Sequence, residues 1–151
     1  MPTIRQATTG DLPSIGHILE DAGLPFSDIG ESHLRDFLVV EKDGAVVGCV
    51  GIERYGNDAL LRSLAVNPSR QGVGQGRHLV EAIETYAREA GVKRLFLLTN
   101  SASGFFEDHG YHEIARSSAP EALHHSTQFS QLCPANAVCM EKALGLASRD
   151  A

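Results

Sequence analysis

A short apolar run over 60–66 leads through a proline into a glycine-rich loop, and a helical pattern follows the loop. The loop carries Gly72, Gly74 and Gly76 at alternate positions. Such a loop exposes backbone N–H groups at a helix N-terminus, where their partial positive charge suits a phosphate or pyrophosphate. From Ala59 through Val80 the chain has three arginines and no acidic residue, although its net charge is −6. The sequence therefore predicts an anion site on a strand–loop–helix unit.

Two common nucleotide-binding loops do not fit this pattern. A P-loop requires Gly-x-x-x-x-Gly-Lys-Ser/Thr, and no lysine follows these glycines. A dinucleotide fingerprint requires Gly-x-Gly-x-x-Gly and an acidic residue about 20 positions further on. Here the spacing is Gly-x-Gly-x-Gly, and the next expected strand ends in Thr99-Asn100. What remains is either a different anion loop or a glycine-rich turn that only caps a helix.

Composition limits the class of protein. With 151 residues, 42% of them hydrophobic and 21% charged, the chain predicts one globular domain. It has no apolar run of about 18 residues and no charged-then-apolar leader, which predicts neither a membrane protein nor an exported one. Three widely spaced cysteines favour a reducing, cytoplasmic setting, and the acidic balance argues against nucleic acid as a partner.

Helical and strand patterns alternate along the chain. Apolar spacing, turn residues and glycine stops predict strands at 3–6, 37–41, 46–53, 60–66, 94–99, 111–114 and 137–142. Helices are expected from a Thr9 cap to Gly23, over a weaker stretch at 26–34, from the glycine loop to Ala90, and at 102–109. A Lys42-Asp43-Gly44 turn is expected to join two of the strands into a hairpin.

The loop Gln71-Gly72-Val73-Gly74-Gln75-Gly76 matches the Arg/Gln-x-x-Gly-x-Gly/Ala signature of the GNAT N-acetyltransferase superfamily. The element order from Thr3 to Leu144 resembles that fold, as do the segments at 4–8 and 105–111. The resemblance implies an α/β (α+β) fold in a single domain over residues 1–144. Its mixed central sheet would have about 6–7 strands with about four helices. Residues 145–151 are expected to form a flexible tail.

Two narrower resemblances point to subfamilies. The segments 51–56, 61–66 and 132–140 resemble the acetyltransferases of arsenic-resistance operons, the ArsN type. The segment Leu97-Leu98-Thr99, together with Phe105-Phe106, is similar to the transferase domain of N-acetylglutamate synthases.

The superfamily resemblance implies acetyl-CoA as the co-substrate. Backbone amides of the loop would hold its pyrophosphate, the edge of the strand before the loop would pair with its pantetheine amides, and one strand N–H would serve the developing oxyanion. The expected cofactor-binding residues are Leu64, Ala65, Val66, Gln71, Gly72, Val73, Gly74, Gln75, Gly76, Arg77 and Phe106.

Proton transfer is expected to involve Glu53, at the end of the third strand, as general base. An α-amino group has a free pKa of about 8, so a modest base suffices. The alternative is a solvated carboxylate at a strand end. The family's strand-four Glu falls on Leu60-Leu61 here, and its acid Tyr falls on Phe106. A thiol pKa of about 8.5 lets thiolate leave with solvent or backbone donors instead.

The acceptor is expected to be a small-molecule amine. Arg62 and Arg54 could pair with a carboxylate or an oxyanion, which predicts an amino acid or amino-acid analogue linked to arsenic resistance. The alternative is a pair of surface arginines that balance nearby acids. Cys133 and Cys139 are weak candidates for a metalloid site, the histidines lack ligand spacing, and no metal is predicted.

Two functions follow from these patterns. One is an acetyl-CoA-dependent N-acetyltransferase. The other is a CoA-binding or arsenical-responsive module without turnover, suggested by Phe106 and the missing strand-four Glu. The irregular stretch at 117–134 is long enough to cover a partner, so a homodimer is expected as one arrangement.

Overall fold

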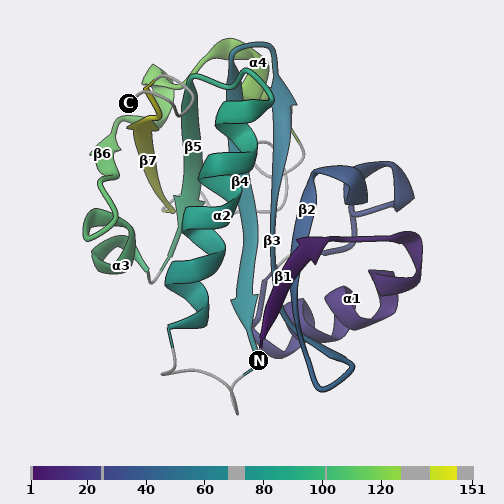
Figure 1. Cartoon of the computed structure of the whole chain (residues 1–151). Coiled ribbons are helices and arrows are strands. Elements are labelled where there is room, and N and C mark those ends of the chain that lie inside the picture. The colour runs from purple at the N-terminus through teal and green to yellow at the C-terminus, as the bar shows by residue number, and fades with distance from the viewer. Residues whose placement is uncertain (1, 25, 68–73, 101, 127–136, 146–151) are drawn as a thin grey trace. The chain divides into compact units, whose positions relative to one another are not determined.

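The computed structural model describes residues 2–24, 26–67, 74–100, 102–126 and 137–145. Seven strands are hydrogen bonded in the order β1-β2-β3-β4-β5-β7-β6 (Figure 1). The elements in chain order are β1 (Thr3–Gln6), η1 (Thr9–Asp11), α1 (Leu12–Asp21), η2 (Glu31–Asp36), β2 (Phe37–Lys42), β3 (Ala45–Tyr55), β4 (Asp58–Val66), α2 (Gln75–Glu89), β5 (Arg94–Thr99), α3 (Ser103–Glu107), β6 (His112–Ile114), η4 (Arg116–Ser118), α4 (Glu121–His124) and β7 (Val138–Ala143).

The chain forms two compact units. Unit 1 comprises Met1–Glu53 and Arg62–Tyr86, and unit 2 comprises Arg54–Leu61 and Ala87–Ala151. The division cuts through β3, β4 and α2, so each unit holds part of these three elements.

Antiparallel pairing of β1, β2 and β3 forms the sheet of unit 1. Asp43 and Gly44, with φ of 54° and 79°, form the turn between β2 and β3. Positive φ at both central residues defines the tight hairpin turn that matches strand twist, which confirms the expected Lys42-Asp43-Gly44 turn. The register then places Val39 opposite Cys49.

Helix α1 begins at a charged cap. The Asp11 carboxylate accepts the Thr8 backbone N–H at 2.7 Å and two Arg5 guanidinium N–H groups at 2.8 and 3.0 Å. Hydrogen bonding from Arg5 lowers the pKa of Asp11 to about 2, although burial opposes the shift. The prediction of Thr9 as the cap is wrong, because Thr9 starts one turn of 3-10 helix and Asp11 occupies the cap position.

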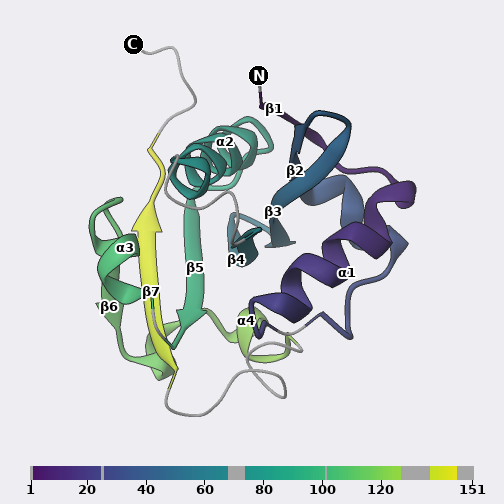
Figure 2. The same cartoon turned by 90° about the horizontal axis from the view of Figure 1, so that it is seen from below.

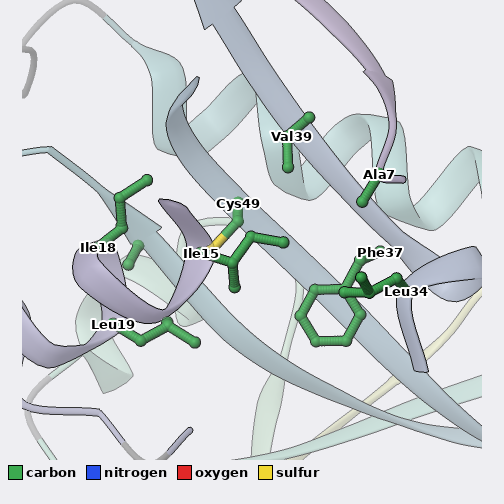
Figure 3. Packing of buried hydrophobic residues seen from close by; sticks show 9 residues of the cluster. Ala7, Ile15, Ile18, Leu19, Leu34, Phe37, Val39 and Cys49 are labelled. Carbon is green, nitrogen blue, oxygen red and sulfur yellow. The ribbon is translucent and has the colours of Figure 1, made fainter. Parts of the chain in front are cut away.

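The core of unit 1 lies between α1 and the strands. Figure 3 shows the α1 side chains Ile15, Ile18 and Leu19 directed toward the strands that carry Val39 and Cys49. Helix α2 covers the other face of these strands (Figure 2), where Leu79 lies 3.3 Å from the position that a Cβ on Gly48 would take. Both helices thus bury their apolar face against the same strands, as their spacing predicts.

In unit 2, β5 pairs in parallel with the start of β4 and antiparallel with β7, whose other edge pairs with β6. The β4–β5 ladder runs from Asp58 opposite Arg94 to Leu60 opposite Phe96. A second buried cluster contains Leu60, Phe96, Ala119, Leu123 and Cys139. The α/β class and the mixed sheet of the expected fold are confirmed.

Two expectations fail locally. The helix predicted over 26–34 is absent, and residues 31–36 instead form the 3-10 helix η2. The chain there is organised by Gly30, whose N–H donates to His33 Nδ1 at 2.9 Å and whose carbonyl accepts the His33 N–H at 3.0 Å. Helix α4, with buried Leu123, lies in a stretch expected to be irregular, because four residues are too few for a periodic signal. Residues 146–151 of the expected tail lie outside the described residues.

None of the helices in the described part of the chain has both the length and the hydropathy needed to cross a bilayer.

Candidate active site

Strand β4 contains a residue in the left-handed backbone region. Ser63 has a φ of 62°, although it is not a glycine and does not lie in a turn. This conformation costs about 1–2 kcal/mol for an L-residue. It also rotates the adjoining peptide groups out of the regular ladder direction, as in a β-bulge. Strain of this kind persists only where the surroundings enforce it.

Two side chains enforce the conformation at Ser63. Arg62 Nε–H donates to Ser63 Oγ at 2.9 Å. The thiol of Cys49, on β3, donates to the Ser63 carbonyl oxygen at 3.3 Å. Burial raises the pKa of the Cys49 thiol to about 12, although the Arg62 charge opposes this, so the thiol remains protonated and available as a donor. The hydroxyl and the carbonyl of Ser63 are thus each held by a fixed donor.

Arg62 is itself clamped between two carboxylates. Its guanidinium donates to both oxygens of Asp28, at 2.5 and 2.7 Å, and to Glu53 Oε2 at 2.5 Å. The Arg62 side chain is 0% exposed, and the Asp28 and Glu53 side chains are 14% and 13% exposed. A guanidinium fork on one carboxylate fixes both distance and orientation. Arg62 is therefore a rigid group, and neither it nor Glu53 is a solvated surface side chain.

The charges of this cluster depend on one another. Burial alone lowers the pKa of Arg62, but its hydrogen bonds to Asp28 and Glu53 outweigh burial and the pKa is raised. Burial alone raises the pKa of Asp28, but hydrogen bonding to Arg62 outweighs it and the pKa is lowered. Removing one partner from such a buried pair leaves an uncompensated charge, at a cost of about 3–5 kcal/mol.

A pocket of about 300 Å³ lies beside the segment that carries Asp28. Phe26 and Ile29, on either side of Asp28, line it together with α1 residues that include Leu12, Gly16 and His17. Among the described residues of unit 1, Phe26 is a large apolar side chain that is exposed, at 37%. The short segment 26–29 thus presents apolar groups to the pocket and a carboxylate to Arg62.

The expected anion loop is described from Gly74 onward, and Gln71, Gly72 and Val73 lie outside the described residues. Gly74 has a φ of 80°, and its carbonyl accepts the His78 N–H at 3.1 Å, the first bond of α2. The N–H groups of the first turn, Gln75 to Arg77, have no carbonyl partner within a helix. The Arg77 side chain is 56% exposed at this end of α2. Such N–H groups at a helix start are the kind of donor set that suits an anion, although the Arg77 charge is paired with Glu81 at 3.4 Å.

Two further candidates lie in unit 2. Phe106, on α3, is buried, and its ring stacks edge-on against Tyr111 with centroids 5.4 Å apart. Arg54, near the end of β3, is exposed. The structure therefore brings Glu53 and Arg62 together through a direct hydrogen bond, whereas Arg54 and Phe106 belong to the other unit.

The described cysteines are enclosed. Cys49 and Cys139 are free and buried, and burial raises the pKa of Cys139 to about 11. Cys133, the other half of the weak metalloid candidate, lies outside the described residues. Within the described ranges, no group of three or more His, Cys, Asp or Glu side chains is placed to hold a metal ion.

Sequence reasoning missed Asp28, Ser63 and the role of Cys49. Asp28 lies 34 positions before Arg62, in a segment predicted to be helical, so no local pattern linked the two. Nothing in the apolar run 60–66 signals a positive φ at a serine. These contacts arise from the way the strands and the segment before η2 pack.

The chain resembles known proteins over most of its length. The model of the acetyltransferase (GNAT) domain matches residues 33–113, which is more than half of the chain. An N-acetyltransferase of Chlorobaculum tepidum, itself uncharacterised, is 35% identical over 148 residues and covers 93% of each chain. The chain belongs to the GNAT acetyltransferase family. The resemblance drawn from its glycine loop is confirmed at the level of the family.

Other relatives of this GNAT-family chain are longer proteins. The amino-acid acetyltransferase of Neisseria meningitidis is 31% identical over 127 residues, which are 79% of this chain and 29% of that protein. The structure of N-acetylglutamate synthase from Neisseria gonorrhoeae, complexed with coenzyme A and N-acetyl-glutamate, superposes with a TM-score of 0.83 at 27% identity. It covers 95% of this chain and 35% of that one. This chain thus spans about a third of these relatives.

Proposed function

We propose that this GNAT acetyltransferase moves the acetyl group of acetyl-CoA to the α-amine of a small amino acid or amino-acid analogue. The observation that supports it most is the likeness to a protein solved with coenzyme A and N-acetyl-glutamate. The relative named amino-acid acetyltransferase points to the same acceptor class. The buried Asp28–Arg62–Glu53 cluster holds the carboxylate of Glu53 against Arg62 of β4.

The donor side of the proposal rests on β4 and α2. N–H groups at the start of α2, from Gly74 to Arg77, would bind the pyrophosphate, with Gln71 to Val73 completing the loop. Leu64, Ala65 and Val66 would pair with the amides of the pantetheine arm, and one N–H of this strand would stabilise the oxyanion. Phe106 would pack against the cofactor. Most of these contacts are made by the backbone, so they depend on the chain's conformation more than on its side chains.

Glu53 is the proposed general base. During transfer the amine nitrogen forms a bond to the acetyl carbon, the carbon–sulfur bond breaks, and the sulfur leaves with its electron pair. Glu53 would take the proton from the amine, directly or through water. Its contact with Arg62 fixes the direction of the carboxylate. Leaving thiolate needs no dedicated acid at neutral pH, because solvent can protonate it.

The acceptor is proposed to be held near the segment at 26–29. Arg54 and Arg62, which belong to different units, are proposed as alternative contacts for an acceptor carboxylate. The apolar pocket lined by Phe26 and Ile29 would suit an aliphatic part of the acceptor.

Purified protein and a thiol reagent test this function. Acetyl-CoA is supplied with single amino acids, glutamate among them, and the free thiol released and the mass of the product are followed. We expect thiol release that depends on the acceptor. We also expect a product about 42 Da heavier than the acceptor, because one hydrogen is replaced by an acetyl group. Tight acetyl-CoA binding without acceptor-dependent release would favour the CoA-binding module instead.

A second candidate is an acceptor linked to arsenic resistance. The segments 51–56, 61–66 and 132–140 favour it through their likeness to ArsN-type enzymes. An arsenical or phosphinic amino-acid analogue placed in the same panel distinguishes the two acceptors. Preference for the analogue over glutamate by kcat/KM would support the arsenic-linked acceptor.

A further inference from the structure

We propose that Arg62 is a positioning residue that holds Ser63 in its left-handed conformation and so sets the direction of the β4 N–H groups that follow. This inference rests on the proposed function, because it assigns those N–H groups to the acetyl and pantetheine end of the donor. Asp28 contributes to the same positioning, because it holds the guanidinium of Arg62 in place.

The geometry at Ser63 supports this role. A serine at positive φ is unfavourable by about 1–2 kcal/mol, and relaxation to ordinary strand geometry would turn the neighbouring N–H groups. The Nε–H of Arg62 reaches Ser63 Oγ from the preceding residue at 2.9 Å, while Cys49 holds the Ser63 carbonyl from the neighbouring strand. One contact holds the side chain of Ser63 and the other its carbonyl, and together they resist that rotation.

The carboxylates make the guanidinium a fixed support. An exposed arginine would sample many rotamers, but this side chain is 0% exposed and is held by both oxygens of Asp28 and by Glu53. Asp28 lies between Phe26 and Ile29, which line the pocket proposed for the acceptor. The segment 26–29 is thus joined, through Arg62, to the backbone of β4.

Three variants separate positioning from simple stability. Ser63→Ala removes the Oγ acceptor and keeps the Cβ, whereas Ser63→Gly removes both the acceptor and the penalty of positive φ. Arg62→Lys keeps a cation between the two carboxylates but has no guanidinium Nε–H for Ser63. Thr85→Val is the matched control, because it deletes a hydroxyl bonded to a backbone carbonyl, that of Glu81 at 3.1 Å, on the exposed face of α2.

We expect kcat to fall about tenfold or more in Ser63→Ala and Arg62→Lys, as for lost oxyanion donors, while KM for acetyl-CoA changes less than about threefold. Ser63→Gly should keep or raise the melting temperature and should lose less kcat than Ser63→Ala, because glycine adopts the positive φ without the support of Arg62. Thr85→Val should keep both kinetic constants. Wild-type kcat in both Ser63→Ala and Arg62→Lys would overturn the inference.

Asp28→Asn tests the link to Arg62. The effects of Asp28→Asn and Ser63→Ala on kcat should be non-additive, because both act through one guanidinium. Additive effects would refute the link. If no acceptor is turned over, the proposed function fails but this inference is still tested, because the amide resonances of Ser63 and Leu64 should shift in Asp28→Asn and stay in place in Thr85→Val. Unmoved resonances in Asp28→Asn would refute it independently of activity.

Discussion

The Phe37 ring lies directly over Gly51, its partner on the adjacent strand, where a Cβ would come within 2.3 Å of the ring. Phe37 is the first residue of β2, and Gly51 lies on β3 two residues before Glu53. We expect Gly51→Ala to lower the free energy of unfolding by about 1–3 kcal/mol through overpacking. Chemical denaturation measures the loss.

Two variants check the origin of this effect. Adding Phe37→Leu to Gly51→Ala should cost less than the sum of the single changes, because the smaller side chain leaves room for the methyl group. Gly10→Ala is the control, since its Cβ would meet only Thr8 Oγ1 at 3.9 Å. A Gly51→Ala protein as stable as wild type would contradict the packing observed here.

Low pH should reduce the stability of the fold, because Asp11 becomes protonated. The folded-state pKa of Asp11 is about 2, lowered from 3.8, so the stability it confers is complete above about pH 4 and disappears as the pH falls toward 2. We expect Asp11→Asn to cost about 1–2 kcal/mol at pH 7 and almost nothing at pH 2. Urea denaturation at several pH values measures both. Glu81→Gln, in an exposed pair with Arg77, should cost less than about 0.5 kcal/mol.

Cys49 and Cys139 should resist thiol reagents in the native protein. Burial raises their thiol pKa values to about 12 and about 11, which leaves little thiolate at pH 8. We expect peptide mapping after brief treatment with an aromatic disulfide to show both unlabelled, and to show both labelled in guanidinium chloride. Rapid native labelling of Cys49 would be incompatible with its bond to Ser63.

Gly74 should control the affinity for the donor. A methyl group at a φ of 80° is strained, so Gly74→Ala should disturb the start of α2 at a cost of about 1–2 kcal/mol. We expect KM for acetyl-CoA to rise about 5- to 30-fold. Gly91→Ala is matched in strain, with a φ of 92° and open space around its Cβ, and should lower stability without changing that KM. Equal KM effects in both variants would argue against a donor site at Gly74.

Glu53→Gln distinguishes a base from a support for Arg62. If Glu53 is the base, the rate falls at neutral pH and recovers as the pH rises, because more of the amine is already deprotonated. If Glu53 only holds Arg62, kcat falls by a similar factor at every pH. The pH profile of kcat/KM from pH 6 to 10, with glutamate and acetyl-CoA, measures the difference.

Most of the strands, helices and turns could be predicted from local sequence patterns. The apolar run before the glycines, the periodic Leu79 and Ile83 of α2 and the turn at Asp43-Gly44 each depend on a few neighbouring residues. Such signals identify strands, helices and turns because backbone and side-chain geometry repeat along the sequence. The family signature in the loop came from the same short range.

The glycine loop and the strand–loop–helix order were thus determined by the sequence itself, since both are properties of adjacent residues. Tertiary structure alone decided that Arg62 is buried between Asp28 and Glu53, because Asp28 lies 34 positions away and is brought there by packing. It also decided the left-handed backbone at Ser63, a strain that no propensity predicts and that only the surrounding donors maintain.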